Sequence, residues 1–286
     1  MNEAATTAAN SDQIAFWNNV GGPKWVRFQA LLDRQLDAIG TLAMDGLDLA
    51  AGASVLDVGC GCGSTTLELA RRVGRTGRAT GVDISRPMLA LARERARQDG
   101  VGNAEFLEAD AQSFGFQPGF DALFSRFGVM FFDDPTRAFT NLHGALRRDA
   151  RLSFVCWQAL PLNPWVVVPM MAAIKHVTID MPASPDAPGP FAFADSSRVQ
   201  GILDSAGFRD VTIEPKTVDM LLGGGTDIDD ATSFLMDMGP LARVLGGIDD
   251  RTRAVIADEI REAIRGYAKP GGVAMPGAVW LVRARA

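Results

Sequence analysis

The sequence predicts an α/β fold in which a doubly wound, mostly parallel sheet carries helices on both faces. The first observation is an alternation of strand and helix signals between about residues 52 and 158, which is typical of consecutive strand–helix–strand units. The second is the nearly continuous apolar run SVLDVG at 54–59, as expected for a strand buried on both faces. The third is a glycine-rich turn directly after that run, where sheets of this kind bind ligands.

Seven segments have the apolar or alternating character of strands. They are 54–59 (SVLDVG), 78–85 (RATGVDIS), 104–110 (AEFLEAD), 120–127 (FDALFSRF), 151–157 (RLSFVCW), 209–215 (RDVTIEP) and 278–286 (AVWLVRARA). The first five alternate with helices, so the sequence predicts a seven-stranded sheet that is mostly parallel.

Helical spacing of apolar residues and suitable end residues define the connecting helices. Ser85 is a good cap for the helix after the second strand, and Asp134 before Pro135 is a cap followed by a first-turn proline. Gly207 ends a helix that precedes the sixth strand. Helices are expected at 66–73, from 86, from 135, at 198–206 and over about 249–267.

Composition bounds the function classes. The 286 residues carry a net charge of −6 at pH 7, and no cluster of Lys and Arg stands out, so we expect no nucleic-acid partner. Three cysteines without framework spacing favour a reducing compartment. The N-terminus lacks a signal peptide, and the apolar run at 165–174 contains Pro169 and is too short to span a bilayer. We expect a cytoplasmic protein with no membrane partner, as a monomer or homodimer.

The spacing of the glycines narrows the choice of ligand. Gly59, Gly61 and Gly63 follow the strand that contains Asp57, and glycines let a backbone turn tightly and approach a ligand closely. The dinucleotide fingerprint G-x-G-x-x-G requires a third glycine at position 64, but that residue is Ser64. The pattern therefore favours a nucleotide-type cofactor other than a nicotinamide dinucleotide.

In VLDVGCGCG, GVDIS, EADAQ and FDALFSRFGVMFF, in this order, the chain resembles the class I S-adenosylmethionine (SAM)-dependent methyltransferases. Within that family it is similar to the group that includes ubiquinone and menaquinone C-methyltransferases. The resemblance covers roughly residues 52–158 and implies a Rossmann-like fold, SAM as cofactor and a methyltransferase activity.

Residue chemistry and the resemblance together suggest how SAM is held. Asp83 ends the second strand, where a carboxylate can accept the ribose hydroxyls. The resemblance implies that Asp110 and the N–H of Ala111 meet adenine. Asp57 could hold the ammonium group on the methionine part of SAM, together with backbone carbonyls near Gly59 and Ser125. The full expected cofactor set is Asp57, Gly59, Cys60, Gly61, Gly63, Asp83, Ile84, Met88, Asp110, Ala111, Ser125, Arg126, Trp17 and Trp25.

Metal sites are not expected. Cys60 and Cys62 lie within the glycine-rich turn without a nearby histidine, so we interpret them as small residues facing the sheet. Asp133 and Asp134 resemble a magnesium pair, but Pro135 favours a helix cap.

The acceptor is expected to be small and partly apolar or aromatic. The segment SRFG at 125–128 stands where nucleic-acid amine methyltransferases carry a different motif. Inserts at about 159–197 and 215–277 supply apolar residues for a pocket. His176, in the first insert, is a weak candidate for a general base. A non-catalytic SAM-binding partner protein and a nicotinamide-dependent oxidoreductase are the alternatives.

Residues 1–50 are expected to form a helical lid on a methyltransferase domain of residues 51–286. Asp12 is a suitable cap for a first short helix, and Gly21, Gly22 and Pro23 predict a break before a second one near Lys24. A lid would exclude water from the aligned reactants, and Trp17 or Trp25 would touch the cofactor or the acceptor pocket.

Overall fold

The computed structural model describes residues 10–179, 184–225, 227–238 and 240–286. Its centre is a sheet with the strand order β3-β2-β1-β4-β5-β8-β6, and the two-residue strand β7 pairs with β8. The strands are β1 (Ser54–Val58), β2 (Arg78–Asp83), β3 (Ala104–Glu108), β4 (Phe120–Arg126), β5 (Leu146–Trp157), β6 (Arg209–Leu221), β7 (Ala268–Lys269) and β8 (Gly272–Arg285). The seven expected strands are therefore present, in a mixed α/β fold.

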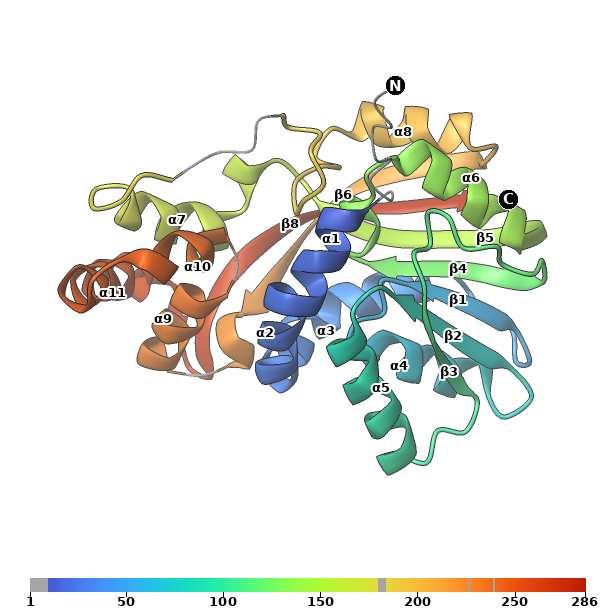
Figure 1. Cartoon of the computed structure of the whole chain (residues 1–286), viewed down its shortest axis with the longest axis horizontal. Helices are drawn as coiled ribbons and strands as arrows, with labels where there is room; N and C mark the ends of the chain where they lie inside the picture. The colour runs from blue at the N-terminus through green and yellow to red at the C-terminus, as the bar shows by residue number, and fades with distance from the viewer. Residues whose placement is uncertain (1–9, 180–183, 226, 239) are drawn as a thin grey trace, which may run out of the picture.

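The sheet is parallel from β3 to β5, and β8 enters antiparallel between β5 and β6. This confirms the predicted mostly parallel sheet. β6 and β8 both extend further than expected, since they pair from Arg209 and Arg285 out to Leu221 and Ala274. Their outer halves leave the sheet as a long two-stranded arm (Figure 1).

Helices cover both faces of the sheet, as predicted. The crossovers run in opposite directions on the two sides of β1, which places α4 and α5 on one face and α6 on the other (Figure 1). The α-helices are α1 (Ser11–Phe16), α2 (Gly22–Arg27), α3 (Gln29–Asp45), α4 (Ser64–Val73), α5 (Arg86–Gln98), α6 (Pro135–Ala145), α7 (Pro164–Ala173), α8 (Ser196–Ser205), α9 (Ile228–Asp237), α10 (Pro240–Val244) and α11 (Asp250–Ile264).

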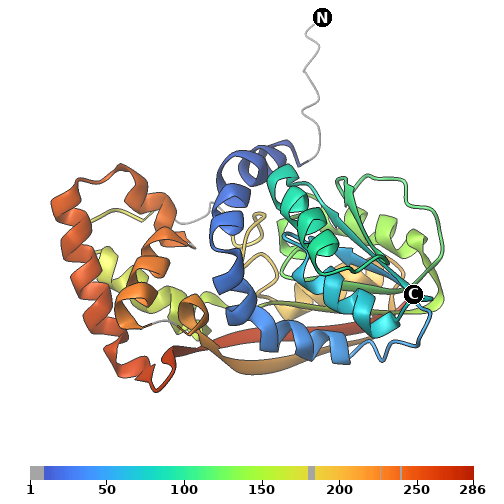
Figure 2. The ribbon, with the colours of Figure 1, turned by 90° about the horizontal axis from the view of Figure 1, so that it is seen from below.

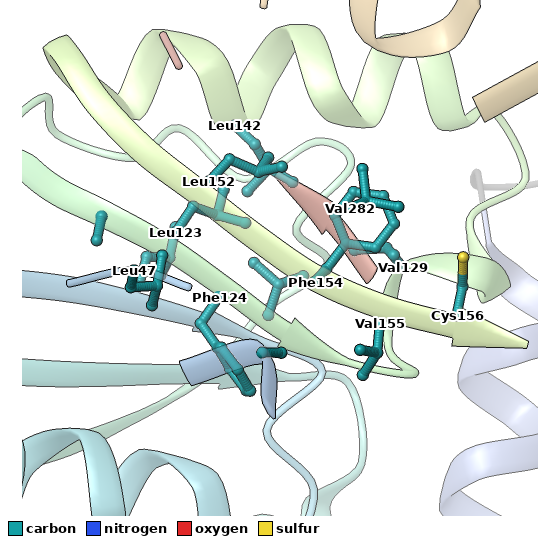
Figure 3. Close-up of a cluster of buried hydrophobic side chains, with 14 of the residues drawn as sticks. Leu47, Leu123, Phe124, Val129, Leu142, Leu152, Phe154, Val155, Cys156 and Val282 are labelled. Atoms are coloured by element: carbon teal, nitrogen blue, oxygen red, sulfur yellow. The ribbon is translucent and has the colours of Figure 1, made fainter. Parts of the chain in front are cut away.

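The main core lies between the sheet and these helices. Apolar side chains from the middle strands, such as Leu123, Phe124 and Phe154, are fully buried there (Figure 3). Because β1, β4 and β5 are buried on both faces, their sequences read as continuous apolar runs. This packing fixes the ends of β1, β2 and β4, which carry the expected site.

A second core lies in a helical insert made of α7, α9, α10 and α11. Its buried members include Leu235, Leu241, Ile256 and Ile260. The insert stands at one end of the molecule on the arm of β6 and β8, and α1 and α2 lie between it and the sheet (Figures 1 and 2). Trp165 packs against both cores.

The expected break at Gly21–Pro23 is wrong. The helix continues from α1 through a five-residue π-helix, η1 (Trp17–Gly21), into α2, and Pro23 occupies its first turn. Gly21 and Gly22 are helical and tightly packed, since a Cβ on Gly22 would lie 2.1 Å from the Trp17 carbonyl oxygen and 2.4 Å from the Ser85 Oγ atom. These glycines allow close packing, and the direction changes instead at Phe28, where α2 meets α3.

Within the described ranges, we find no helix with the length and apolar character that a membrane span requires. Residues 1–9, to which the predictions of a missing signal peptide and of the start of the lid apply, lie outside the described residues.

Candidate functional site

The glycine-rich turn joins β1 to α4 at the carboxyl edge of the sheet. Gly59, Gly61 and Gly63 all have positive φ angles, of 71°, 55° and 83°, which favour glycine. A Cβ on Gly59 would lie 2.6 Å from the Cα of Gly128, whereas one on Gly61 would meet only Met88, at 3.7 Å. The turn is therefore packed against the end of β4 at Gly59 and open at Gly61.

Asp57 lies at the centre of the site and is completely buried. Its Oδ2 atom accepts hydrogen bonds from the hydroxyls of Thr65 and Thr66, both at 2.6 Å. Its Oδ1 atom is buried and has no hydrogen-bond partner among the residues that the structure describes. Burial raises the pKa of Asp57 to about 6, although the two hydroxyls and Arg126 oppose the shift. An unpartnered carboxylate oxygen is costly, so it marks a place for a donor.

Asp83 holds the turn from the end of β2. Its Oδ2 atom accepts the N–H of Gly61 at 2.8 Å, and its Oδ1 atom accepts the N–H of Ser85 at 2.8 Å. Burial raises the pKa of this carboxyl group above its ordinary value, against the effect of the backbone N–H groups. Asp83 thus links the glycine-rich turn to the start of α5.

Asp110 follows β3 and is fixed by the N-terminal segment. Its Oδ1 atom accepts from the Asn10 side-chain amide and from the N–H of Gln112, both at 2.9 Å. The side-chain Oδ1 atom of Asn10 in turn accepts the N–H of Asp133 at 2.8 Å. Within the described part of the chain, the one contact of Asp110 Oδ2 is with Ser113 at 3.4 Å, so this oxygen retains capacity to accept another donor.

Ser125 and Arg126 end β4. The Ser125 hydroxyl donates to the Val58 carbonyl at 2.7 Å, which ties β4 to the end of β1. The Arg126 guanidinium is largely buried against α3, where it lies 3.9 Å from the Asp33 carboxylate, and it also attracts Asp57 electrostatically.

Four other predicted residues lie beside the turn or at the strand ends next to it. Met88 is buried and contacts the open side of Gly61. The Ile84 carbonyl accepts the Asn18 side-chain amide at 2.9 Å. Ala111 is buried after β3, and Cys60 lies under the turn, within 2.8 Å of where a Cβ on Gly81 would stand.

The N-terminal helices lie across this edge. The Trp17 carbonyl accepts the Ser85 hydroxyl at 2.8 Å, and the Trp17 ring packs edge-on against Phe131 at 5.2 Å and against Trp25 at 6.2 Å. Trp17 is therefore brought to the strand ends through contacts with residues that follow β2 and β4, and Trp25 packs behind it on the Trp17 ring.

His176 lies elsewhere. It follows α7 and hydrogen-bonds Glu259 of α11 at 2.8 Å, beside Lys175. Since α11 stands at the far end of the helical insert (Figures 1 and 2), these contacts do not bring His176 to the glycine-rich turn.

Three residues of the site were not anticipated. Asn10 and Asn18 connect the N-terminal segment to Asp110, Ile84 and Arg86, and nothing in their sequence context distinguishes them from surface asparagines. Phe127 follows β4 with a φ of 63° and stacks on Trp157 at 4.2 Å. Such strain in a bulky residue is typical of functional sites.

Metal-ligating side chains do not gather in the described part of the chain, where no group of three or more His, Cys, Asp or Glu could hold an ion. Burial raises the pKa of Cys62 to about 12 and that of Cys60 well above its ordinary value. Both residues are therefore thiols at neutral pH.

The chain is similar to known proteins over its first half. Residues 55–149 match the family model described as a methyltransferase domain. A 2-phytyl-1,4-naphtoquinone methyltransferase of Thermosynechococcus vestitus is 46% identical over 77 residues, which are 27% of this chain and 33% of that protein. The ubiquinone/menaquinone biosynthesis C-methyltransferase UbiE of Escherichia coli is 35% identical over 103 residues, 35% of this chain and 41% of that protein. The chain thus matches less than half the length of these curated relatives.

The fold extends further than the sequence similarity. The YcgJ protein of Bacillus subtilis superposes with a TM-score of 0.56 over 86% of this chain and 97% of its own, at 18% identity. At this identity the comparison supports the architecture alone.

Proposed function

We propose that this chain, whose residues 55–149 form a class I SAM-dependent methyltransferase domain, transfers a methyl group from SAM to a small, partly apolar or aromatic acceptor. The observation that carries the proposal is the unpartnered Oδ1 atom of Asp57, buried beneath an open glycine turn. An ammonium group is a donor that suits a buried carboxylate. SAM carries such a group on its methionine part, so the residues present fit this cofactor.

The neighbouring carboxylates suit the rest of the cofactor. Asp83 ends β2 and Asp110 follows β3, the next strand outward from β1. Asp83 would therefore meet the ribose and Asp110 the adenine, which lies further from Asp57. Asp110 would accept the adenine amine on Oδ2, the oxygen that Asn10 leaves free. Ile84 and Met88 would pack against the adenosine. Gly59, Cys60, Gly63, Ser125 and Arg126 would shape the turn and its surroundings.

The chemistry is a displacement: the acceptor forms a bond to the methyl carbon while the carbon–sulfur bond of the sulfonium breaks. Bound SAM supplies this activated methyl group. The work of the chain is to align the acceptor, to exclude water and to hold both partners in place. Asp83 and Ser125 serve this purpose, because Asp83 bonds the glycine-rich turn to the end of β2 and Ser125 bonds the end of β4 to Val58, directly before the turn.

We further propose that residues 10–27, the part of the N-terminal segment before Phe28, act as the lid of the domain formed by residues 51–286. Asn10, Trp17 and Asn18 bond the residues that follow β2 and β3, and Trp17 and Trp25 form an aromatic layer with Phe131. With Gly21 and Gly22 packed inside the helix, the joint at Phe28 is where the lid would turn.

Hydrogen exchange tests the lid. Demethylated SAM should slow exchange of the amides of residues 12–22 at least tenfold, because the bound cofactor would hold the segment on Asp110 and Ile84. The amides of α11 provide the internal control, since they lie far from this edge and should be unaffected. Equal exchange in residues 12–22 with and without the ligand would show that the segment is fixed scaffold.

Calorimetric titration tests the cofactor. SAM and its demethylated product should bind, and NAD should not, because the glycine spacing lacks the dinucleotide fingerprint. Binding of NAD without binding of SAM would favour the oxidoreductase alternative and contradict the proposal.

Turnover with methyl-labelled SAM against a panel of small molecules separates the enzyme from a non-catalytic SAM-binding protein. The panel should include demethylated quinols, since two relatives are named quinone methyltransferases. The negative charge and the three thiol cysteines support action on a small molecule in the cytoplasm, without nucleic acid.

A further inference from the structure

We infer that the guanidinium group of Arg126 binds the carboxylate on the methionine part of SAM, and so makes the chain selective for cofactors that keep this carboxylate. The inference rests on the proposed function, since it concerns the same cofactor site. It assigns a ligand to a buried cation that has no close acceptor among the described residues.

Arg126 is buried but poorly bonded. Its side chain is 11% exposed, and a guanidinium group carries five N–H donors. Within the described part of the chain, its contacts with acceptors are 3.5 Å to the Leu36 carbonyl and 3.9 Å to the Asp33 carboxylate. Both exceed the usual hydrogen-bond length of about 2.7–3.2 Å. A buried charged donor without a close acceptor is costly, so this place suits an anionic ligand.

The carboxylates around Arg126 are engaged elsewhere. The Oδ2 atom of Asp33 accepts the guanidinium of Arg95 at 2.8 Å and also the side-chain amide of Gln29. Asp37 attracts Arg126 electrostatically, but it is an exposed residue of α3. Burial lowers the pKa of Arg126, and the attraction of these acids opposes that shift. They reduce the cost of burying the cation without occupying its donors.

Arg126 lies on the same face of the sheet as Asp57. β1 and β4 pair in parallel with Asp57 opposite Phe124, and residues two apart in a strand point to the same face. A Cβ on Gly40 of α3 would lie 3.3 Å from the Arg126 side chain and 3.9 Å from that of Thr65, whose hydroxyl bonds Asp57. The cation and the buried carboxylate thus approach the glycine-rich turn together, from adjacent strands.

An α-amino acid group fits this pair of charges. Its ammonium and carboxylate groups are bound to the same carbon atom, as on the methionine part of SAM. In the proposed complex the ammonium meets Oδ1 of Asp57, and repulsion between the two carboxylates turns that of SAM away from Asp57. Arg126 can then donate two parallel N–H groups to it, the geometry in which a guanidinium binds a carboxylate best.

Calorimetric titration of the full chain with three probes tests the inference. The probes are SAM, decarboxylated SAM, which keeps the ammonium but has no carboxylate, and methylthioadenosine, which has neither group. The unchanged chain should bind SAM about 10- to 150-fold more tightly than decarboxylated SAM, as expected for hydrogen bonds that involve charged groups. Equal affinity for these two probes would overturn the inference, and this comparison requires no variant.

Arg126→Gln should weaken SAM binding by the same factor and remove the preference, while methylthioadenosine should bind as it does to the unchanged chain. Arg126→Lys keeps a charge without the planar pair of donors and should give an intermediate preference. Arg72→Gln is the matched control. Arg72 is also partly buried, at 27% exposure, and bonds Asp45 of α3 at 2.6 Å, but it lies in the last turn of α4, away from the glycine-rich turn. Its replacement should leave the preference unchanged.

Thermal unfolding verifies that each variant folds. An equal loss of SAM affinity in the Arg126→Gln and Arg72→Gln variants would overturn the inference, as would an Arg126→Gln variant that still prefers SAM. Methylthioadenosine reports on the proposed function separately, because it keeps the adenosine part and lacks the amino acid. If neither it nor SAM binds, the proposed function fails and the inference fails with it. If both bind without a preference for the carboxylate, the inference alone is contradicted.

Discussion

Replacing Asp83 with alanine should weaken SAM binding by about 10- to 150-fold, measured by calorimetry at pH 7. Hydrogen bonds that involve a charged group contribute about 1.5–3 kcal/mol, and this carboxylate would accept the ribose hydroxyls. Its oxygens also accept the N–H groups of Gly61 and Ser85, both at 2.8 Å. The substitution therefore removes a ligand contact and loosens the turn that would carry the methionine part.

Two other aspartates serve as comparisons. Asp110→Ala should weaken binding less, since its partner in the proposed complex is a neutral amine. Asp121→Ala is the control for the loss of a strand carboxylate: Asp121 accepts the N–H of Ser54 at 2.9 Å, at the opposite end of β1 and β4. Asp121→Ala should leave SAM affinity unchanged. If a folded Asp83→Ala variant binds SAM as tightly as the unchanged chain, the ribose contact is assigned to the wrong residue.

The fold could be predicted where local signals agree with the tertiary structure. β1 reads as an apolar run because it is central and buried on both faces. Asp134 caps α6 as expected, with its side chain accepting the N–H of Arg137 at 3.0 Å. The glycines of the turn could be recognised because positive φ angles restrict the choice of residue.

Other features depend on partners distant in sequence. Gly21, Gly22 and Pro23 have the composition of a helix break, but packing of Gly22 against Ser85 keeps the helix continuous. Asn10 is 100 residues from Asp110, so their hydrogen bond cannot be predicted from a local sequence pattern. The prediction for His176 used only its position in the insert, and its hydrogen-bond partner Glu259 lies 83 residues later in the chain.

The predicted cofactor residues also fall into two groups, those placed by the strand order and those placed by docking of the N-terminal helices. Asp57, Asp83 and the glycines lie together because they end adjacent parallel strands, a relation that the strand order fixes. The positions of Trp17 and Trp25 depend on how the N-terminal helices dock, and docking of that kind leaves no periodic signal. Their contact with SAM stays a prediction.

Asp57→Asn should stabilise the free chain and weaken SAM binding at pH 7. In the folded chain the pKa of Asp57 is about 6, against an ordinary value of 3.8, so the folded state binds the proton more tightly than the unfolded state. The contribution of Asp57 to the free energy of unfolding must then fall as the pH rises from about 4 to about 6, by about 3 kcal/mol in total. Asparagine carries no charge and removes this loss. Thermal unfolding across that range should show a smaller decline for the variant.

SAM binding should have the opposite pH dependence. The ammonium group would favour the ionised carboxylate, so binding should release a proton below pH 6 and affinity should rise up to tenfold per pH unit there, then level off near pH 7. In Asp57→Asn this rise should disappear, because the amide must keep its oxygen toward Thr65 and Thr66 and turn its NH₂ group toward the ammonium. Calorimetry in two buffers of different ionisation enthalpy counts the released proton. An unchanged pH profile in the variant would show that the unpartnered oxygen of Asp57 does not meet the charged end of the cofactor.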